Sequence, residues 1–185
     1  MKLIILEGGT SVGKSTIARK LAADLHVSAF LKDDYKEKVF DSLHEPLTLK
    51  RAHEIEKDSW NAVFEAAGKA VSEDKSIIIE GNFYRSHRRA IQKRLAPNAV
   101  VVEIYCYAKG FTVLKRYIKR NHSGKRHPGH KDHLWYGLVA LEAPFMWLEK
   151  YIRPMRLSSN FLKVNTEDFA RVDYRAIERC IKHAT

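Results

Sequence analysis

The segment LIILEGGTSVGKS, residues 3–15, decides the fold of this chain. Gly8 is followed by four residues and then by Gly13, Lys14 and Ser15, which is the spacing of a phosphate-binding P-loop. The apolar run at 2–6 predicts a buried strand, and the apolar spacing within 14–25 predicts a helix. The loop therefore lies between a strand and a helix, where the helix N-terminus adds partial positive charge to an anion site.

Each residue type in this loop has its own task in phosphate binding. The glycines let backbone amides turn toward an anion, Lys14 reaches the β- and γ-phosphates, and the Ser15 hydroxyl is placed to ligate Mg²⁺. We expect the nucleotide to be bound by Gly8, Gly9, Thr10, Ser11, Val12, Gly13, Lys14, Ser15 and Thr16.

Strand and helix patterns alternate along the rest of the chain. Apolar runs predict strands at 2–6, 27–31, 76–80, 99–105 and 161–164. Helical patterns fall near 14–25, 48–72, 84–95, 110–121, 133–151 and 172–183. This alternation is typical of a parallel sheet covered by helices. We expect one domain over residues 1–185, with a mobile lid at about 121–131, where NHSGKRHPGHK is polar and broken by glycine and proline.

The positive charge of the chain is concentrated in one stretch. The net charge is +11, and residues 85–131 contain 13 Lys or Arg but one acid, Glu103, so that stretch alone carries +12. A local excess of this kind predicts a polyanionic ligand, whereas an ordinary solvated surface mixes acids with bases. The sequence contains no apolar run of the ~18 residues that a membrane span needs and no signal-peptide pattern, so we expect a soluble protein of the cytoplasm.

Acidic and amide side chains follow the second and third predicted strands. Asp33 and Asp34 lie at the carboxyl end of the second strand, where ligands of parallel sheets bind. Asp33 is the candidate for orienting an acceptor hydroxyl and taking its proton, and helix capping is the alternative for both aspartates. Glu80 could hold a Mg²⁺-bound water or pair with Arg85 or Lys32. Asn82 could bind an acceptor or cap the next helix.

The predicted helix at 110–121 and the loop after it supply candidate phosphate-binding cations. Arg116 and Arg120 are four residues apart on one helical face, and guanidinium groups bind phosphate bidentately and neutralise charge on a transferred γ-phosphoryl group. Lys125 and Arg126 could close over the same phosphates, and an exposed solvated face is the alternative for all four. The loop histidines match no zinc spacing, so we predict no metal site there. The aromatic side chains further on are predicted to form core or pocket wall: Trp135, Tyr136, Trp147 and Tyr151.

Taken together, GGTSVGKST, LKDDYKE, IIIEGNF, the Arg116/Arg120 pair and FLKVNTED resemble the small P-loop kinases of the adenylate-kinase-like group. These include predicted kinases called AAA domains and, more distantly, the phage-type polynucleotide 5′-hydroxyl kinases. The resemblance implies an α/β P-loop NTPase three-layer sandwich with a five-stranded parallel sheet, helices on both faces and a basic lid. It also implies that the protein uses ATP and Mg²⁺, that Asp33 is the base, and that Arg116 and Arg120 are the arginines of the lid. Glu80, where many relatives have Asp, and the HPGH loop depart from the pattern.

These features predict an ATP-dependent kinase that phosphorylates a hydroxyl of a small, anionic acceptor. ATP is the expected donor because an NKxD sequence for guanine is absent. A polynucleotide 5′-hydroxyl kinase is the first alternative, motivated by the +12 stretch. A nucleotide-gated binding module that transfers nothing is the second. The predicted catalytic residues are Lys14, Asp33, Arg116 and Arg120, and the predicted metal ligands are Ser15 and Glu80.

Overall fold

Strands and helices alternate along the chain as the apolar runs predict. The computed structural model describes residues 1–43, 48–97, 99–124, 126–130 and 153–185. The strands are β1 (Lys2–Gly8), β2 (Ser28–Leu31), β3 (Ile77–Glu80), β4 (Val100–Tyr107) and β5 (Phe161–Asn165). The helices are α1 (Lys14–Leu25), α2 (Lys32–Asp41), α3 (Leu49–Ser72), α4 (Arg85–Arg94), α5 (Gly110–His122) and α7 (Tyr174–His183). Two short 3₁₀ helices are η1 (Pro128–His130) and η3 (Phe169–Arg171).

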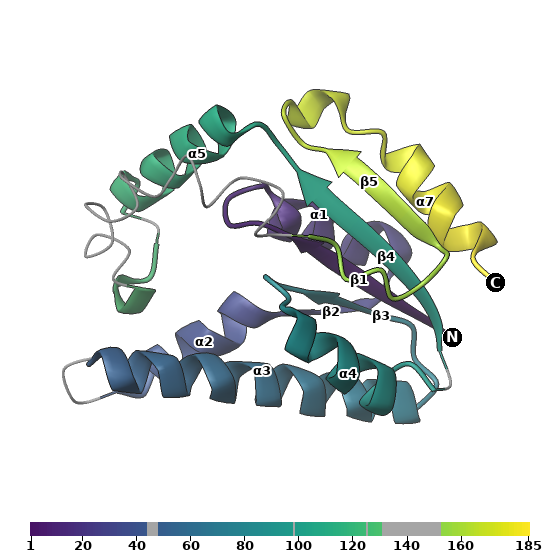
Figure 1. Ribbon diagram of the computed structural model, residues 1–185, viewed down its shortest axis with the longest axis horizontal. Helices are drawn as coiled ribbons and strands as arrows, with labels where there is room; N and C mark the ends of the chain where they lie inside the picture. The colour runs from purple at the N-terminus through teal and green to yellow at the C-terminus, as the bar shows by residue number, and fades with distance from the viewer. Residues whose placement is uncertain (44–47, 98, 125, 131–152) are drawn as a thin grey trace.

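The five strands form one sheet in the order β2-β3-β1-β4-β5 (Figure 1). Every pair of neighbouring strands is parallel, so the predicted five-stranded parallel sheet is confirmed. β1 lies at the centre and leads directly into the P-loop. The carboxyl ends of the strands therefore meet at one edge of the sheet, beside the N-terminus of α1.

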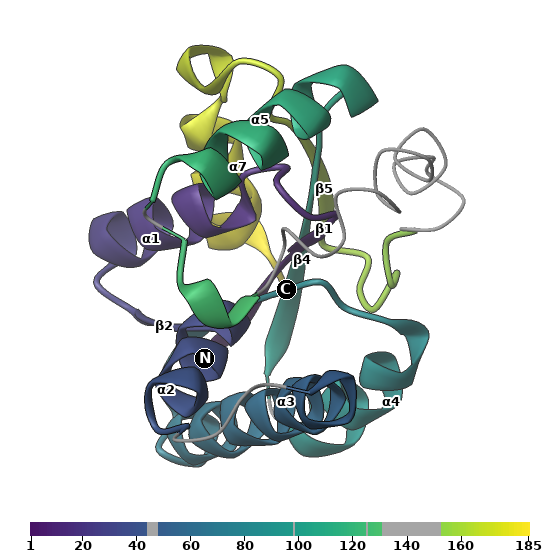
Figure 2. The same cartoon turned by 90° about the vertical axis from the view of Figure 1, so that its left-hand side faces the viewer.

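Helices cover both faces of the sheet, as Figures 1 and 2 show. Leu3 and Ile5 of β1 pack with the cluster that includes side chains of α3 and α4. Ile4 and Leu6, which point the other way, pack with the cluster that includes α1 and α7. Because both faces are buried, β1 is a continuous apolar run rather than an alternating one. No helix in the described ranges is long and apolar enough to span a bilayer.

Two glycines of the P-loop occupy positions that no other residue fits without displacement. Gly8 has φ +138°, and a Cβ built there would lie 2.2 Å from the carbonyl oxygen of Cys106. Gly13 has φ +97°, and its Cβ would lie 2.2 Å from Cζ of Phe169. A side chain at either position would therefore strain the backbone and push the loop away from its neighbours.

The observed helices include one, α2, that the expected helical patterns did not contain. α2 begins at Lys32, directly after β2, and contains both Asp33 and Asp34 in its first turn. Its N-cap is Leu31 and no side chain caps it, so capping by either aspartate is not observed. Acidic side chains in a first turn still favour the helix by interacting with its dipole. The helix expected at 133–151 and its aromatic residues lie outside the described residues.

Two buried carboxylates hold the segment that enters β5 against the sheet. Glu7 of β1 and Glu103 of β4 are 2% and 0% exposed. Glu7 accepts hydrogen bonds from the amide of Met155 at 3.1 and 3.2 Å, and Glu103 accepts from the amides of Arg156 and Leu157. Burial, a hydrogen bond with Glu103 and the charge of Glu103 raise the pKa of Glu7 to about 9. Glu7 therefore carries a proton at neutral pH.

Replacing Glu7 with glutamine is expected to change how stability depends on pH. A group whose pKa rises from 4.5 to about 9 on folding stabilises the protein fully below pH 4.5 and loses that contribution as pH rises through 9. Glutamine keeps the shape and does not titrate. Urea unfolding at pH 5, 7 and 9 should show the variant gaining on the wild type as pH rises. Glu73→Gln, at an exposed site, is the control and should show no such trend, and parallel curves for Glu7→Gln and wild type would contradict the assignment.

Candidate active site

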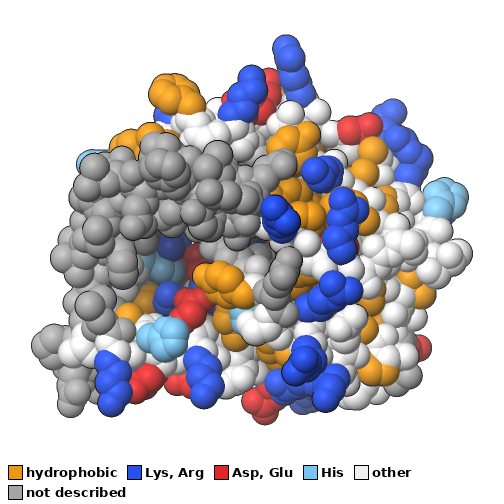
Figure 3. All heavy atoms as spheres, viewed as in Figure 1, with side chains coloured by type: hydrophobic (Ala, Val, Ile, Leu, Met, Phe, Trp, Pro, Cys, Tyr) orange, Lys and Arg blue, Asp and Glu red, His pale blue; other side chains and the backbone are white. Residues whose placement is uncertain are grey.

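A cavity of about 740 Å³ opens at the carboxyl edge of the sheet, between the P-loop, α2 and α5. Figure 3 shows the hollow beside α2, with acidic, basic and histidine side chains inside it. Eleven of the predicted site residues line the cavity: Thr10, Ser11, Gly13, Lys14, Ser15, Thr16, Asp33, Glu80, Arg116, Arg120 and Arg126. Residues predicted from distant parts of the sequence are thus brought together at one place.

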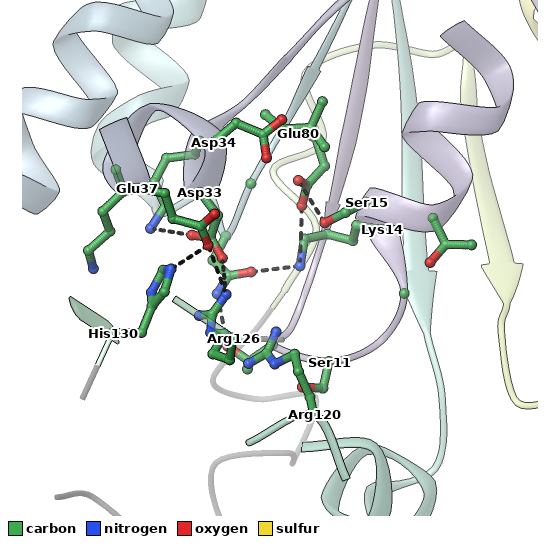
Figure 4. Close-up of a pocket in the computed structure, with 18 of the residues that line it drawn as sticks. Ser11, Lys14, Ser15, Asp33, Asp34, Glu37, Glu80, Arg120, Arg126 and His130 are labelled. Atoms are coloured by element: carbon green, nitrogen blue, oxygen red, sulfur yellow. Dashed lines mark hydrogen bonds and ion pairs between the residues drawn. The ribbon is translucent and has the colours of Figure 1, made fainter. Parts of the chain in front are cut away.

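Lys14 is the buried cation of the cavity. Its side chain is 6% exposed, and Nζ lies 3.7 Å from Oε1 of Glu80. The same Nζ donates to the carbonyl of Gly9 and to Oδ1 of Asn82, both at 2.7 Å (Figure 4). Burial lowers the pKa of Lys14, and the carboxylate of Glu80 opposes that shift. A polyphosphate beside Lys14 would act in the same sense as Glu80 and favour the ammonium form.

Ser15 and Glu80 place two oxygen ligands beside Lys14. The hydroxyl of Ser15 donates to Oε2 of Glu80 at 3.0 Å. Burial raises the pKa of Glu80, so its charged form is costly there without a cation. A hydroxyl and a carboxylate oxygen fit Mg²⁺, which takes one or two protein oxygens and completes its shell with water and substrate phosphates. In the described residues no group of three or more His, Cys, Asp or Glu could hold a metal ion.

Two buried polar atoms that line the cavity have no hydrogen-bond partner among the described residues. They are Oγ of Ser11, in the P-loop, and Nη1 of Arg116. Buried donors normally find an acceptor, so this pair fits a ligand rich in oxygen atoms, such as a nucleoside triphosphate. The residues present therefore match the group that the P-loop predicts.

The two arginines of α5 have different surroundings, although both line the cavity. Nη2 of Arg116 donates to the carbonyls of Thr166 and Glu167, and its guanidinium lies 4.5 Å from the ring centre of Phe169. Arg116 is thus fixed at the β5 side of the cavity. Arg120 instead points toward the P-loop, and like Arg126 it lines the cavity (Figure 4).

Asp33 lies opposite the P-loop, between two cations. Nζ of Lys32 is 3.2 Å from Oδ1 of Asp33, and Nη1 of Arg126 is 3.2 Å from Oδ2. Burial works to raise the pKa of Asp33, but the charges of Lys32 and Arg126 outweigh it and hold that pKa well below its ordinary value. Asp34, the neighbouring acid, pairs with Arg19 at 2.6 Å and is 45% exposed.

The segment after α5 packs against α2. Besides the Arg126 contact, His130 lies 2.8 Å from Glu37, and His127 lies 3.0 Å from Asp41. A Cβ on Gly129 would meet the ring of Phe40 at 2.4 Å, so the backbone approaches α2 closely. The histidines of this loop therefore face carboxylates of α2.

Three predicted residues of the P-loop do not line the cavity, and Lys125, also predicted to bind phosphate, lies outside the described residues. Gly8 packs on the backbone of Cys106, and the carbonyl of Gly9 accepts from Lys14. The side chain of Val12 belongs to the core, and its carbonyl accepts from the Thr166 hydroxyl at 2.6 Å. These three residues therefore support the conformation of the P-loop without lining the cavity.

Most of the positive charge of residues 85–131 also lies elsewhere. Basic side chains gather over α4 in Figure 3. Four of them are exposed on that helix and are not among the cavity-lining side chains of the described ranges: Arg88, Arg89, Lys93 and Arg94.

The sequence did not predict the roles of Asn82 and Glu56. The amide of Asn82 accepts from Lys14 and donates to Oγ1 of Thr10 at 3.0 Å, so it braces the P-loop. It does not cap α4, whose N-cap is Tyr84. Glu56 of α3 accepts from Lys32 at 2.8 Å and faces the cavity. The position of Asn82 after β3 could have indicated a role in the site. Nothing in the local pattern of α3 distinguishes Glu56 from a surface acid.

The fold and the P-loop define a nucleotide-binding P-loop protein with the architecture of the small P-loop kinases. The family model described as "AAA domain" matches residues 3–138. Because this match spans more than half of the chain, the protein belongs to that family. A search of curated proteins found no match.

Solved kinase structures share the whole fold. A candidate kinase from Chloroflexus aurantiacus J-10-fl is 24% identical with a TM-score of 0.88, over 100% of this chain and 98% of that chain. A gluconokinase from Sinorhizobium meliloti 1021 is 15% identical, with a TM-score of 0.59 over 99% and 93%. A shikimate kinase from Bacteroides thetaiotaomicron is 18% identical, with a TM-score of 0.51 over 98% and 94%. These matches lend no support to the more distant resemblance to polynucleotide kinases, which remains a prediction.

Proposed function

We propose that this protein is an ATP-dependent phosphotransferase that moves the γ-phosphoryl group to a hydroxyl of a small molecule. The observation that carries the proposal is the placement of Lys14 and Asp33 in one cavity, on its P-loop side and its α2 side. A phosphate cradle and a carboxylate facing it are the parts that in-line transfer to a hydroxyl needs.

In this mechanism the acceptor hydroxyl lies against Asp33, which orients it and takes its proton. The acceptor oxygen bonds to the γ-phosphorus as the bond from that phosphorus to the β–γ bridging oxygen breaks, and ADP leaves. The low pKa of Asp33 keeps it ionised but makes it a weak base, so orienting the hydroxyl is its main contribution. A weak base suffices in a loose transition state, because the acceptor hydroxyl can lose its proton late in the transfer.

Charge on the transferred group is neutralised from the opposite side. Lys14 contacts the β- and γ-phosphates, and Arg120 and Arg116 reach the same cavity from α5. Mg²⁺, held by Ser15 and Glu80, would neutralise phosphate charge when bound. The Arg126 segment, packed on α2, serves as the lid that excludes water and suppresses hydrolysis.

The test is transfer of labelled γ-phosphate from ATP, with Mg²⁺, to pooled acceptors. The pools contain nucleosides, nucleotides, sugars, aminoglycosides and 5′-hydroxyl oligonucleotides. A labelled small molecule is the expected result. A labelled oligonucleotide would favour the polynucleotide kinase alternative, and ATP bound without any labelled product would favour a nucleotide-gated binding module.

A further inference from the structure

The cavity has a nucleotide side and an acceptor side that differ in charge. On the nucleotide side, as far as the described residues go, Lys14, Arg116 and Arg120 accompany one carboxylate, that of Glu80. This side has a positive excess that suits a triphosphate. We call acceptor side the part formed by α2, α3 and the segment after α5. Its charged and histidine side chains, among the described residues, are Lys32, Asp33, Asp34, Lys36, Glu37, Glu56, Arg126 and His130.

On the acceptor side each cation is already paired. Lys32 lies 2.8 Å and Lys36 2.7 Å from the carboxylate of Glu56. Arg126 lies 3.2 Å from Asp33. Burial lowers the pKa of His130 to about 3, so this imidazole adds no charge at neutral pH. Among the described residues, three cations therefore face three carboxylates, with Glu37 as the third, and a fourth carboxylate of α2, Asp34, pairs with Arg19 of α1.

This balance bears on what the acceptor side can bind. A phosphate or carboxylate placed there would have to displace Glu56 or Asp33 from its partner, or lie beside it and be repelled. Burial also makes the loss of a partner costly, because Lys32 is 8% exposed and would keep its charge in a poorly solvated place. Hydroxyl groups meet neither obstacle, because they donate to carboxylate oxygens and accept from ammonium groups without adding charge.

We propose that the acceptor is an uncharged polyhydroxylated molecule, of the sugar or nucleoside kind, rather than a phosphorylated or carboxylated one. The proposal rests on the proposed function and replaces the anionic acceptor suggested by the +12 stretch. The structure places much of that stretch on α4, and Arg116 and Arg120 on the nucleotide side.

Matched acceptor pairs that differ by one phosphate test the proposal. Uridine is compared with uridine 5′-monophosphate, glucose with glucose 6-phosphate, and glycerol with glycerol 3-phosphate. In each pair that is labelled, kcat/KM should favour the uncharged member by about tenfold or more, the order of effect expected for one unfavourable charge contact. Preference for the phosphorylated members would overturn the proposal while leaving the phosphotransferase intact.

A binding measurement decides the question without turnover. With the nucleotide side filled by a non-hydrolysable ATP analogue and Mg²⁺, inorganic phosphate and glucose 6-phosphate are titrated by calorimetry. Wild type should show no saturable binding of either. Glu56→Gln removes the carboxylate that pairs with Lys36 and leaves Lys32 with Asp33 alone, so this variant should bind both ligands, with an affinity about tenfold or more above that of the wild type.

Glu65→Gln is the matched control, because Glu65 is exposed on the same helix and does not line the cavity. It should behave as wild type. Saturable phosphate binding by the wild type would contradict the proposal whether or not Glu56→Gln folds. If no acceptor is labelled, the phosphotransferase proposal fails, and the phosphate titration still decides the charge preference of this side.

Discussion

Replacing Lys14 with methionine is expected to abolish almost all phosphoryl transfer. Methionine fits the buried path of the lysine stem, so the fold should persist, but the ammonium group that faces the phosphates is gone. Loss of one preorganised donor to a developing charge costs about 10²- to 10³-fold in kcat. Nucleotide affinity should fall as well, because Lys14 is expected to contact the phosphates in the ground state. The measurements are labelled transfer from ATP and calorimetric binding of an ATP analogue.

Lys20→Met is the control for this variant. Lys20 lies on the same helix, is about half exposed and pairs with Asp24 at 2.8 Å, outside the cavity. Its loss should leave transfer near the wild-type rate. A wild-type rate of transfer by Lys14→Met would show that the P-loop lysine takes no part in the reaction.

Asp33→Asn is expected to lower kcat by about 10²-fold, the low end of the contribution of a positioned general base, because Asp33 is a weak base that mainly orients the hydroxyl. Asparagine keeps the shape of the side chain but cannot accept the hydroxyl proton. Affinity for the ATP analogue should change little, because Asp33 lies on the α2 side of the cavity. Since Lys32 and Arg126 outweigh burial and hold the pKa of Asp33 low, the wild-type rate should not decline between pH 7 and 5 through this group.

Asp34→Asn is the matched control for Asp33→Asn. The two residues are neighbours, but Asp34 pairs with Arg19 and is nearly half exposed. Its replacement should cause a much smaller loss of kcat than Asp33→Asn does. Equal losses of kcat in the two variants, or a parallel loss of nucleotide affinity in Asp33→Asn, would argue against Asp33 as the base.

The sheet and the P-loop could be predicted because their signals are local. Apolar runs mark the strands, and the spacing from Gly8 to Ser15 marks the loop between β1 and α1. The rule that ligands bind at the carboxyl ends of parallel strands then placed Asp33 and Glu80 near the loop, and both line the cavity.

The contacts that tune these groups could not be predicted in the same way. Arg126 and Asp33 are 93 residues apart, and Lys32 and Glu56 are 24 apart on different helices. Such pairs depend on how helices pack on the sheet, which no local pattern records. The net charge has the same limit, because a total of +12 over residues 85–131 does not say which side chains face the cavity.

Glu7 and Glu103, which together form a clamp on the main chain at 155–157, have a consequence for sequence variation. Both carboxyl groups accept from main-chain amides at 155–157, so these hydrogen bonds do not depend on which side chains occupy those positions. Proline is the exception, because it has no amide hydrogen to donate. Pro154 stands one residue before the clamp, where none of these bonds is made. The hydrogen bonds that return the chain to the sheet are thus insensitive to side-chain identity, and the limits on variation come instead from packing, because Met155 is buried in the core, and from the backbone of Arg156, whose φ is +54°.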